Sequence, residues 1–154
     1  MMSPRFVRKG SLSMHVLSPA LCALALMSVS GPALARDSWK ATTERGLPVL
    51  SLSQGEGTVR IVCDPDRVFG PMSNGAVIVS LPKDKAPTTV VFLAKTGEQA
   101  RLPVANGTAA QAKAEAAEWT KMVEILRKGG EFAVVSSDDS LSFETVPLPD
   151  LACE

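Results

Sequence analysis

Short runs of alternating apolar and polar residues cover most of the chain after residue 35. In residues 58–63 the side chains of Val59, Ile61 and Cys63 fall on one face and that of Arg60 on the other, which is the period-two pattern of a half-buried strand. Comparable runs, separated by Gly, Pro and Asn turns, predict further strands at 39–43, 49–53, 76–81, 88–94, 99–105, 131–136 and 141–146.

Two of these runs have a predicted place in a sheet. The run at 88–94 is apolar on both faces, which is typical of a central strand. Pro103 places the run at 99–105 at a sheet edge or a bulge, because proline has no N–H to donate to a ladder.

The periodicity changes to that of a helix over residues 109–128. Thr108 and Gln111 fit a capping box, and Gly129 is a natural C-cap. The first turns are poor in large apolar residues, so a start as late as Glu115 is the alternative. One face of the helix is apolar and carries Ala112, Ala116, Trp119, Val123 and Leu126. About eight short strands and one amphipathic helix predict an all-β fold, a sandwich or a partly open barrel.

The first 35 residues read as a secretory signal peptide that is cleaved after Ala35. A positive start is followed by an apolar stretch at 17–29 and by a small-residue A-x-A site at 33–35. The apolar stretch is shorter than the roughly 20 residues that a spanning helix needs. We therefore expect a single β-rich domain at 36–154 in the periplasm or outside the cell, with no membrane span after cleavage.

The charge of residues 36–154 argues against nucleic-acid binding, and their two cysteines predict a disulfide. Removing three basic residues with the leader leaves thirteen Lys and Arg against sixteen Asp and Glu, a net charge of −3. This mildly acidic domain has no basic stripe, so nucleic-acid binding is not expected. Cys63 and Cys153 remain, and in an oxidising compartment they are expected to form a disulfide.

The residue inventory argues against most catalysis. The only histidine, His15, belongs to the leader, so residues 36–154 have no Ser-His-Asp triad, Cys-His pair or histidine-ligated zinc. No nucleotide-binding or nucleophile-elbow motif occurs, and no cofactor is expected. A Ser-Lys dyad or a carboxylate pair stays open, but neither has a local signature. We expect a protein that is not an enzyme.

The segment at 64–75 is the candidate recognition site. Its residues of interest are Asp64, Asp66, Arg67, Phe69 and Met72. Calcium needs six to eight oxygen ligands, more than its two aspartates supply, so no metal is predicted. Its aromatic and arginine side chains suit an interface anchor, whereas Phe69 folded back onto the sheet would make the segment a structural turn.

The layout resembles that of small exported bacterial proteins. The matching pieces are Trp39, VRIVC at 59–63, WTKMVEILRKGGEFAVVS at 119–136 and LACE at 151–154. In this order they are similar to the invasion-associated locus B proteins and the type VI secretion-associated VasI proteins. The resemblance implies a periplasmic, non-catalytic β-sandwich with an envelope or secretion role.

Two functions follow from these observations. The first is an exported binding or accessory protein that recognises another envelope or secreted protein. The alternative is an inhibitor or immunity protein that acts on an envelope hydrolase through the segment at 64–75.

Overall fold

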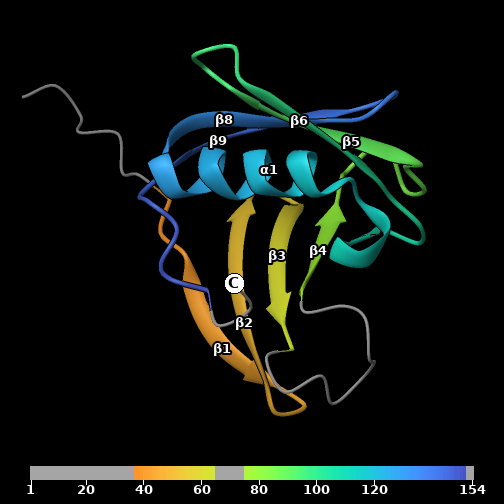
Figure 1. Ribbon diagram of the computed structural model, residues 1–154. Coiled ribbons are helices and arrows are strands. Elements are labelled where there is room, and N and C mark those ends of the chain that lie inside the picture. The colour runs from red at the N-terminus through yellow and green to blue at the C-terminus, as the bar shows by residue number, and fades with distance from the viewer. Residues whose placement is uncertain (1–36, 65–74, 152–154) are drawn as a thin grey trace, which may run out of the picture. The chain divides into compact units, whose positions relative to one another are not determined.

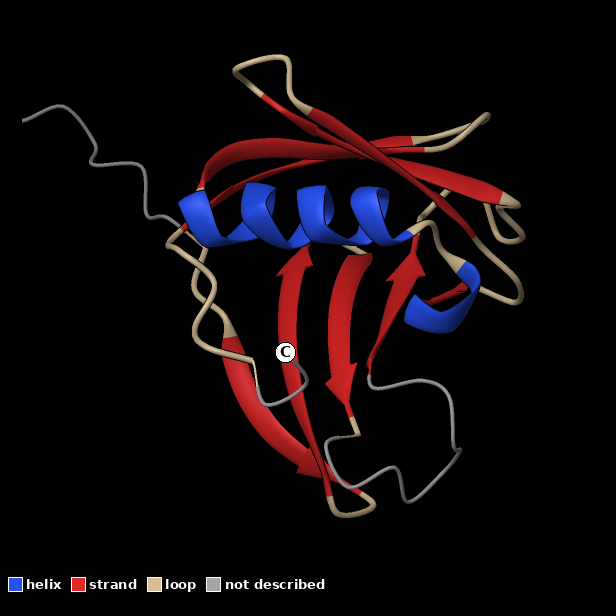
Figure 2. Ribbon diagram, viewed as in Figure 1, coloured by secondary structure: helices blue, strands red, loops and turns tan. Residues whose placement is uncertain are grey.

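Two antiparallel sheets account for most of the residues that the computed structural model describes, which are 37–64 and 75–151 (Figures 1 and 2). The five-stranded sheet has the order β1-β2-β3-β4-β7, with β1 (Lys40–Glu44), β2 (Leu47–Gln54), β3 (Gly57–Cys63), β4 (Gly75–Ser80) and β7 (Thr108–Ala110). The four-stranded sheet has the order β6-β5-β8-β9, with β5 (Thr89–Ala94), β6 (Gln99–Pro103), β8 (Gly130–Val135) and β9 (Ser140–Thr145). The mainly β prediction is confirmed, and within the described residues the strands form two sheets and no closed barrel.

The helix is shorter than the sequence predicts. The helix α1 spans Ala116–Lys128 and is preceded by a short 3-10 turn, η1, at Gln111–Lys113. The prediction of a helix from residue 109 is wrong, because Ala109 and Ala110 pair with β4 as part of β7. The alternative prediction, a helix that starts as late as Glu115, is confirmed. Glu115 is the N-cap residue of α1 and has an extended backbone. Edge pairing with β4 therefore overrides the high helix propensity of alanine.

Two tight turns have the backbone of a hairpin turn: the first joins the paired strands β1 and β2, and the second is closed by the isolated bridge between Ala105 and Thr108. At Arg45 and Gly46 φ is 51° and 86°, and at Asn106 and Gly107 it is 52° and 75°. Positive φ at both central residues is the signature of a type I′ hairpin turn, whose twist matches that of the strands. The predicted capping box of Thr108 and Gln111 is wrong, because Thr108 begins β7.

The core lies where the inner faces of both sheets meet the apolar face of α1, which contacts β5 and β6. Trp39 and Trp119 are both buried there, and Trp119 lies on the helix face that the sequence predicts to be apolar. The strand β5 lies inside its sheet between β6 and β8, so its central position is confirmed. The prediction that both faces of β5 are buried is wrong, since the Leu93 side chain is 39 % exposed. The four-stranded sheet therefore has one covered face.

The C-terminal tail returns to the core after β9. The Leu148 N–H donates to the Leu126 carbonyl at the end of α1, at 2.9 Å. Gly129 ends the helix with φ of 64°, and a Cβ there would lie 2.6 Å from the Pro147 nitrogen. Only glycine therefore fits where the tail crosses the helix end.

The predicted signal peptide and one of the two predicted disulfide cysteines cannot be compared with the structure. The signal peptide at 1–35 and Cys153 lie outside the described residues. Export, cleavage and the pairing of Cys63 with Cys153 therefore stay predictions. In the part of the chain at 37–64 and 75–151, no helix is long and apolar enough to cross a membrane.

Candidate functional site

The predicted recognition segment is described only at its two ends. Asp64 directly follows β3 and is 7 % exposed, and Cys63 pairs with Gly75 at the start of β4. Asp66, Arg67, Phe69 and Met72 lie outside the described residues. Among residues 37–64 and 75–151, no group of three His, Cys, Asp or Glu side chains is placed to hold a metal ion.

A charged groove lies between β6 and the N-terminal half of α1. It has a volume of about 570 Å³. We call it the β6–α1 groove, and its lining residues are Thr89, Gln99, Arg101, Pro103, Lys113, Glu115, Glu118 and Lys121. They come from β5, β6, η1 and α1, so the fold assembles the groove from separate parts of the sequence.

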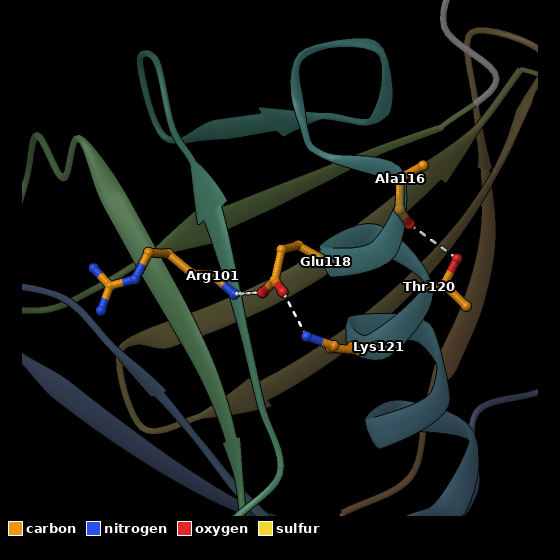
Figure 3. Close-up of polar contacts among 5 residues, drawn as sticks. All are labelled: Arg101, Ala116, Glu118, Thr120 and Lys121. Carbon is orange, nitrogen blue, oxygen red and sulfur yellow. Dashed lines mark hydrogen bonds and ion pairs between the residues drawn. The ribbon is translucent and has the colours of Figure 1, made fainter.

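Glu118 connects the two walls of the groove (Figure 3). Its Oε2 atom accepts a hydrogen bond from the Arg101 backbone N–H at 2.7 Å, and its Oε1 atom accepts one from Lys121 Nζ at 2.7 Å. Lys121 lies one helical turn beyond Glu118, where side chains three residues apart are neighbours. One carboxylate thus binds both the helix surface and the edge of the sheet.

These contacts set the charge state of the groove. The hydrogen bond from Lys121 lowers the pKa of Glu118 below its ordinary value, and the bond from the Arg101 N–H lowers it further. Donating this hydrogen bond to Glu118 also raises the pKa of Lys121. Both groups are therefore charged at neutral pH, and Glu118 is a poor general acid.

The same contacts close the outer edge of β6. Among the described strands, β6 pairs with β5 alone, so its other edge faces the groove. The Arg101 N–H on that edge is already bound by Glu118, and Pro103 on the same edge has no N–H. Proline and inward charges are devices that block strand addition. The predicted edge position of the strand is confirmed.

Two cations of the groove, Arg101 and Lys113, differ from Lys121 in having no ion pair within residues 37–64 and 75–151. In Figure 3 the Arg101 side chain extends away from Glu118. No Ser, Cys or His is among the described residues that line the groove. The described lining is dominated by charged side chains, and these are suited to charge recognition.

A second recess lies on the outer face of the five-stranded sheet, away from the core. It has a volume of about 310 Å³ and is lined by Glu44, Arg45, Leu47, Val49, Arg60, Val62 and Ile78. Arg60 of β3 forms an ion pair with Glu44 of β1 across the strand β2 between them, which confirms that Arg60 points away from the core. Val62 and Ile78 are only half-buried beside this ion pair.

The sequence did not predict the β6–α1 groove. Its charged residues are individually ordinary and lie on separate elements, β6, η1 and α1 with its N-cap. Two signals were present: Pro103 indicated an edge strand, and Glu118 with Lys121 has ion-pair spacing on a helix. What joins them is the packing of α1 beside β6, which no local pattern encodes.

Comparisons with known proteins give no relative: no family model, no curated protein and no solved structure matches this chain.

Proposed function

We propose that this chain is an exported, non-catalytic binding protein of the bacterial envelope, and that it recognises another envelope or secreted protein through the β6–α1 groove. The observation that carries the proposal is the pair of cations, Arg101 and Lys113, that line the groove without an ion pair among the described residues.

The charge of the groove differs from that of the domain. Residues 36–154 carry a net charge of −3, whereas the groove is lined by three cations and two carboxylates. One carboxylate, Glu118, is already engaged by Lys121 and by the Arg101 backbone. A partner that places acidic side chains beside Arg101 and Lys113 would complete the charge pairing, and such complementarity gives specificity and a fast association.

A capture experiment tests the groove. The mature protein is immobilised and incubated with an envelope extract, beside an Arg101→Glu/Lys113→Glu variant. We expect a partner that the wild type captures and the variant loses, with capture decreasing as salt is raised. Equal capture by both proteins would contradict the proposal.

A charge-matched control separates the groove from general electrostatics. Lys85 is exposed on the loop between β4 and β5 and does not line the groove. A Lys85→Glu/Lys83→Glu variant makes the same change in net charge and should retain the partner.

The alternative function is inhibition of an envelope hydrolase through the segment at 64–75. One observation favours it: Cys63 and Gly75 are register partners, so both ends of the segment are held side by side in the sheet. An inhibitor presents its recognition residues from such a fixed base. A captured hydrolase that an Arg67→Ala/Phe69→Ala variant fails to retain, and that the groove variant still binds, would select this alternative.

A further inference from the structure

As described over residues 37–64 and 75–151, the two sheets have four edge strands, and these differ in how their edges are protected. The edge of β6 is closed by Glu118 and Pro103, as described above. The edge of β9 is partly covered by Asp37, whose N–H donates to the Glu144 carbonyl at 2.7 Å. The strand β7 has only three residues. The remaining edge strand, β1, has five residues, and four of them are exposed.

The backbone groups on the outer edge of β1 can be assigned from its pairing with β2. Glu44 and Leu47 close the two-residue turn, and the Lys40 carbonyl lies on the β2 side, where it accepts a hydrogen bond from Ser51 Oγ at 3.3 Å. Backbone groups alternate in direction along a strand, so those of Ala41 and Thr43 point outward. Within residues 37–64 and 75–151, no hydrogen bond to these outward groups occurs.

We propose that β1 pairs with β1 of a second copy of this chain, antiparallel and centred on Thr42. In this register Ala41 lies opposite Thr43 of the second copy, and Thr43 lies opposite its Ala41. These are the residues whose N–H and C=O groups point outward, so the pairing supplies a partner for each of them. The two sheets then join into one continuous sheet across a two-fold axis, an isologous interface.

The sequence of β1, KATTE, makes this register electrostatically self-complementary. Lys40 lies opposite Glu44 of the second copy, and Glu44 lies opposite its Lys40. Both positions belong to non-hydrogen-bonded pairs, in which facing side chains approach most closely and opposite charges are favourable. The backbone N–H and C=O groups on the edge of β1 could form hydrogen bonds with any added strand. The charge pattern of β1, however, is complementary to that of a second, antiparallel copy of β1.

The side chains at these positions are available for the pairing. Lys40 is exposed and forms no ion pair in the described part of the chain. Glu44 already pairs with Arg60, but a carboxylate has acceptor sites for a second cation. Lys40, Glu44 and Arg60 share the outer face of the sheet, because Lys40 and Arg60 are both register partners of Ser51.

Charge-reversal variants test the register by sedimentation velocity over a range of protein concentrations. Lys40→Glu faces Glu44 of the second copy, and Glu44→Lys faces Lys40, so each variant alone should dimerise about tenfold more weakly than the wild type. A mixture of the two variants places opposite charges at both ends of the pairing. The mixture should therefore form a heterodimer more strongly than either variant forms a homodimer.

A backbone variant tests strand addition itself. In Thr43→Pro the missing N–H is one that β2 does not use, so the monomer should keep its melting temperature while the dimer is lost. Thr43→Ala, which keeps the N–H, should still dimerise. Three results would each overturn the proposal: a wild type that stays monomeric, a dimer that Thr43→Pro leaves intact, and a mixture no tighter than the separate variants.

Discussion

At the scale of single residues, Glu118 is the group whose chemistry the structure defines best. Its carboxylate accepts hydrogen bonds from Lys121 and from the Arg101 N–H, and these bonds lower its pKa below the ordinary value of 4.5. A carboxyl group with a lowered pKa in the folded state stabilises the fold above its unfolded pKa. That stabilisation is lost as the pH falls through the lower, folded pKa.

We predict that Glu118→Gln removes this pH-dependent contribution. Wild type should be more stable than the variant at neutral pH, and the difference should shrink as the pH falls below 4.5. Urea unfolding followed by tryptophan fluorescence at several pH values measures the difference.

The matched control for this variant lies on the same helix. Glu124 is exposed on α1, and no hydrogen bond or ion pair from its side chain occurs in the described part of the chain. Glu124→Gln therefore removes one carboxylate charge from α1 without removing a hydrogen bond or ion pair, and its effect on stability gives the background against which Glu118→Gln is compared. A difference for Glu118→Gln that stays constant down to low pH would contradict the assigned role.

At the scale of elements, the start of α1 allows a sharp test. Ala116 is the first helical residue, it is exposed, and Glu115 before it is extended, with ψ of 134°. Proline is tolerated at the first position of a helix and prefers an extended residue before it. We predict that Ala116→Pro changes the free energy of unfolding by less than about 1 kcal/mol.

The comparison variant places proline one turn later. Thr120 is also exposed but lies inside α1, where proline removes a helical hydrogen bond and costs about 3 kcal/mol or more. Chemical denaturation of both variants gives the two values. If Ala116→Pro were as damaging as Thr120→Pro, the helix would begin earlier, as the alanine-rich sequence at 109–114 first indicates.

The elements that the sequence predicts well are those defined by local signals. The hairpin of β8 and β9 follows from two alternating runs around Asp138 and Asp139, and α1 ends at Gly129 as expected. The start of the helix was mispredicted because Ala109 and Ala110 complete the edge of β4, a strand about 30 residues earlier. The β6–α1 groove was missed for the same reason, since it depends on long-range packing.

At the scale of the whole molecule, the C-terminal tail links the helix to the five-stranded sheet. Leu148 is bound to the end of α1, and Leu151 lines one small pocket with Cys63 and Ile61 of β3. Leu148 and Leu151 are 5 % and 9 % exposed, so the tail is part of the core. Leu151 lies two residues before Cys153, so the described tail ends near the cysteine with which Cys153 is predicted to pair.

We predict that this disulfide contributes strongly to stability. A bridge between Cys63 and Cys153 closes a loop of about 90 residues, and a loop of that length stabilises the fold by roughly 4–5 kcal/mol in the chain-entropy model. For a domain of this size the melting temperature should fall by about 10–20 °C when the protein is reduced. Cys153→Ser should melt at the temperature of the reduced wild type, and reductant should not lower its melting temperature further.

Alkylation of the unfolded, unreduced wild type shows whether the disulfide is present, because a bridged protein takes up no label on Cys63 or Cys153. Two labelled thiols would show that the tail is held by the burial of Leu148 and Leu151 alone.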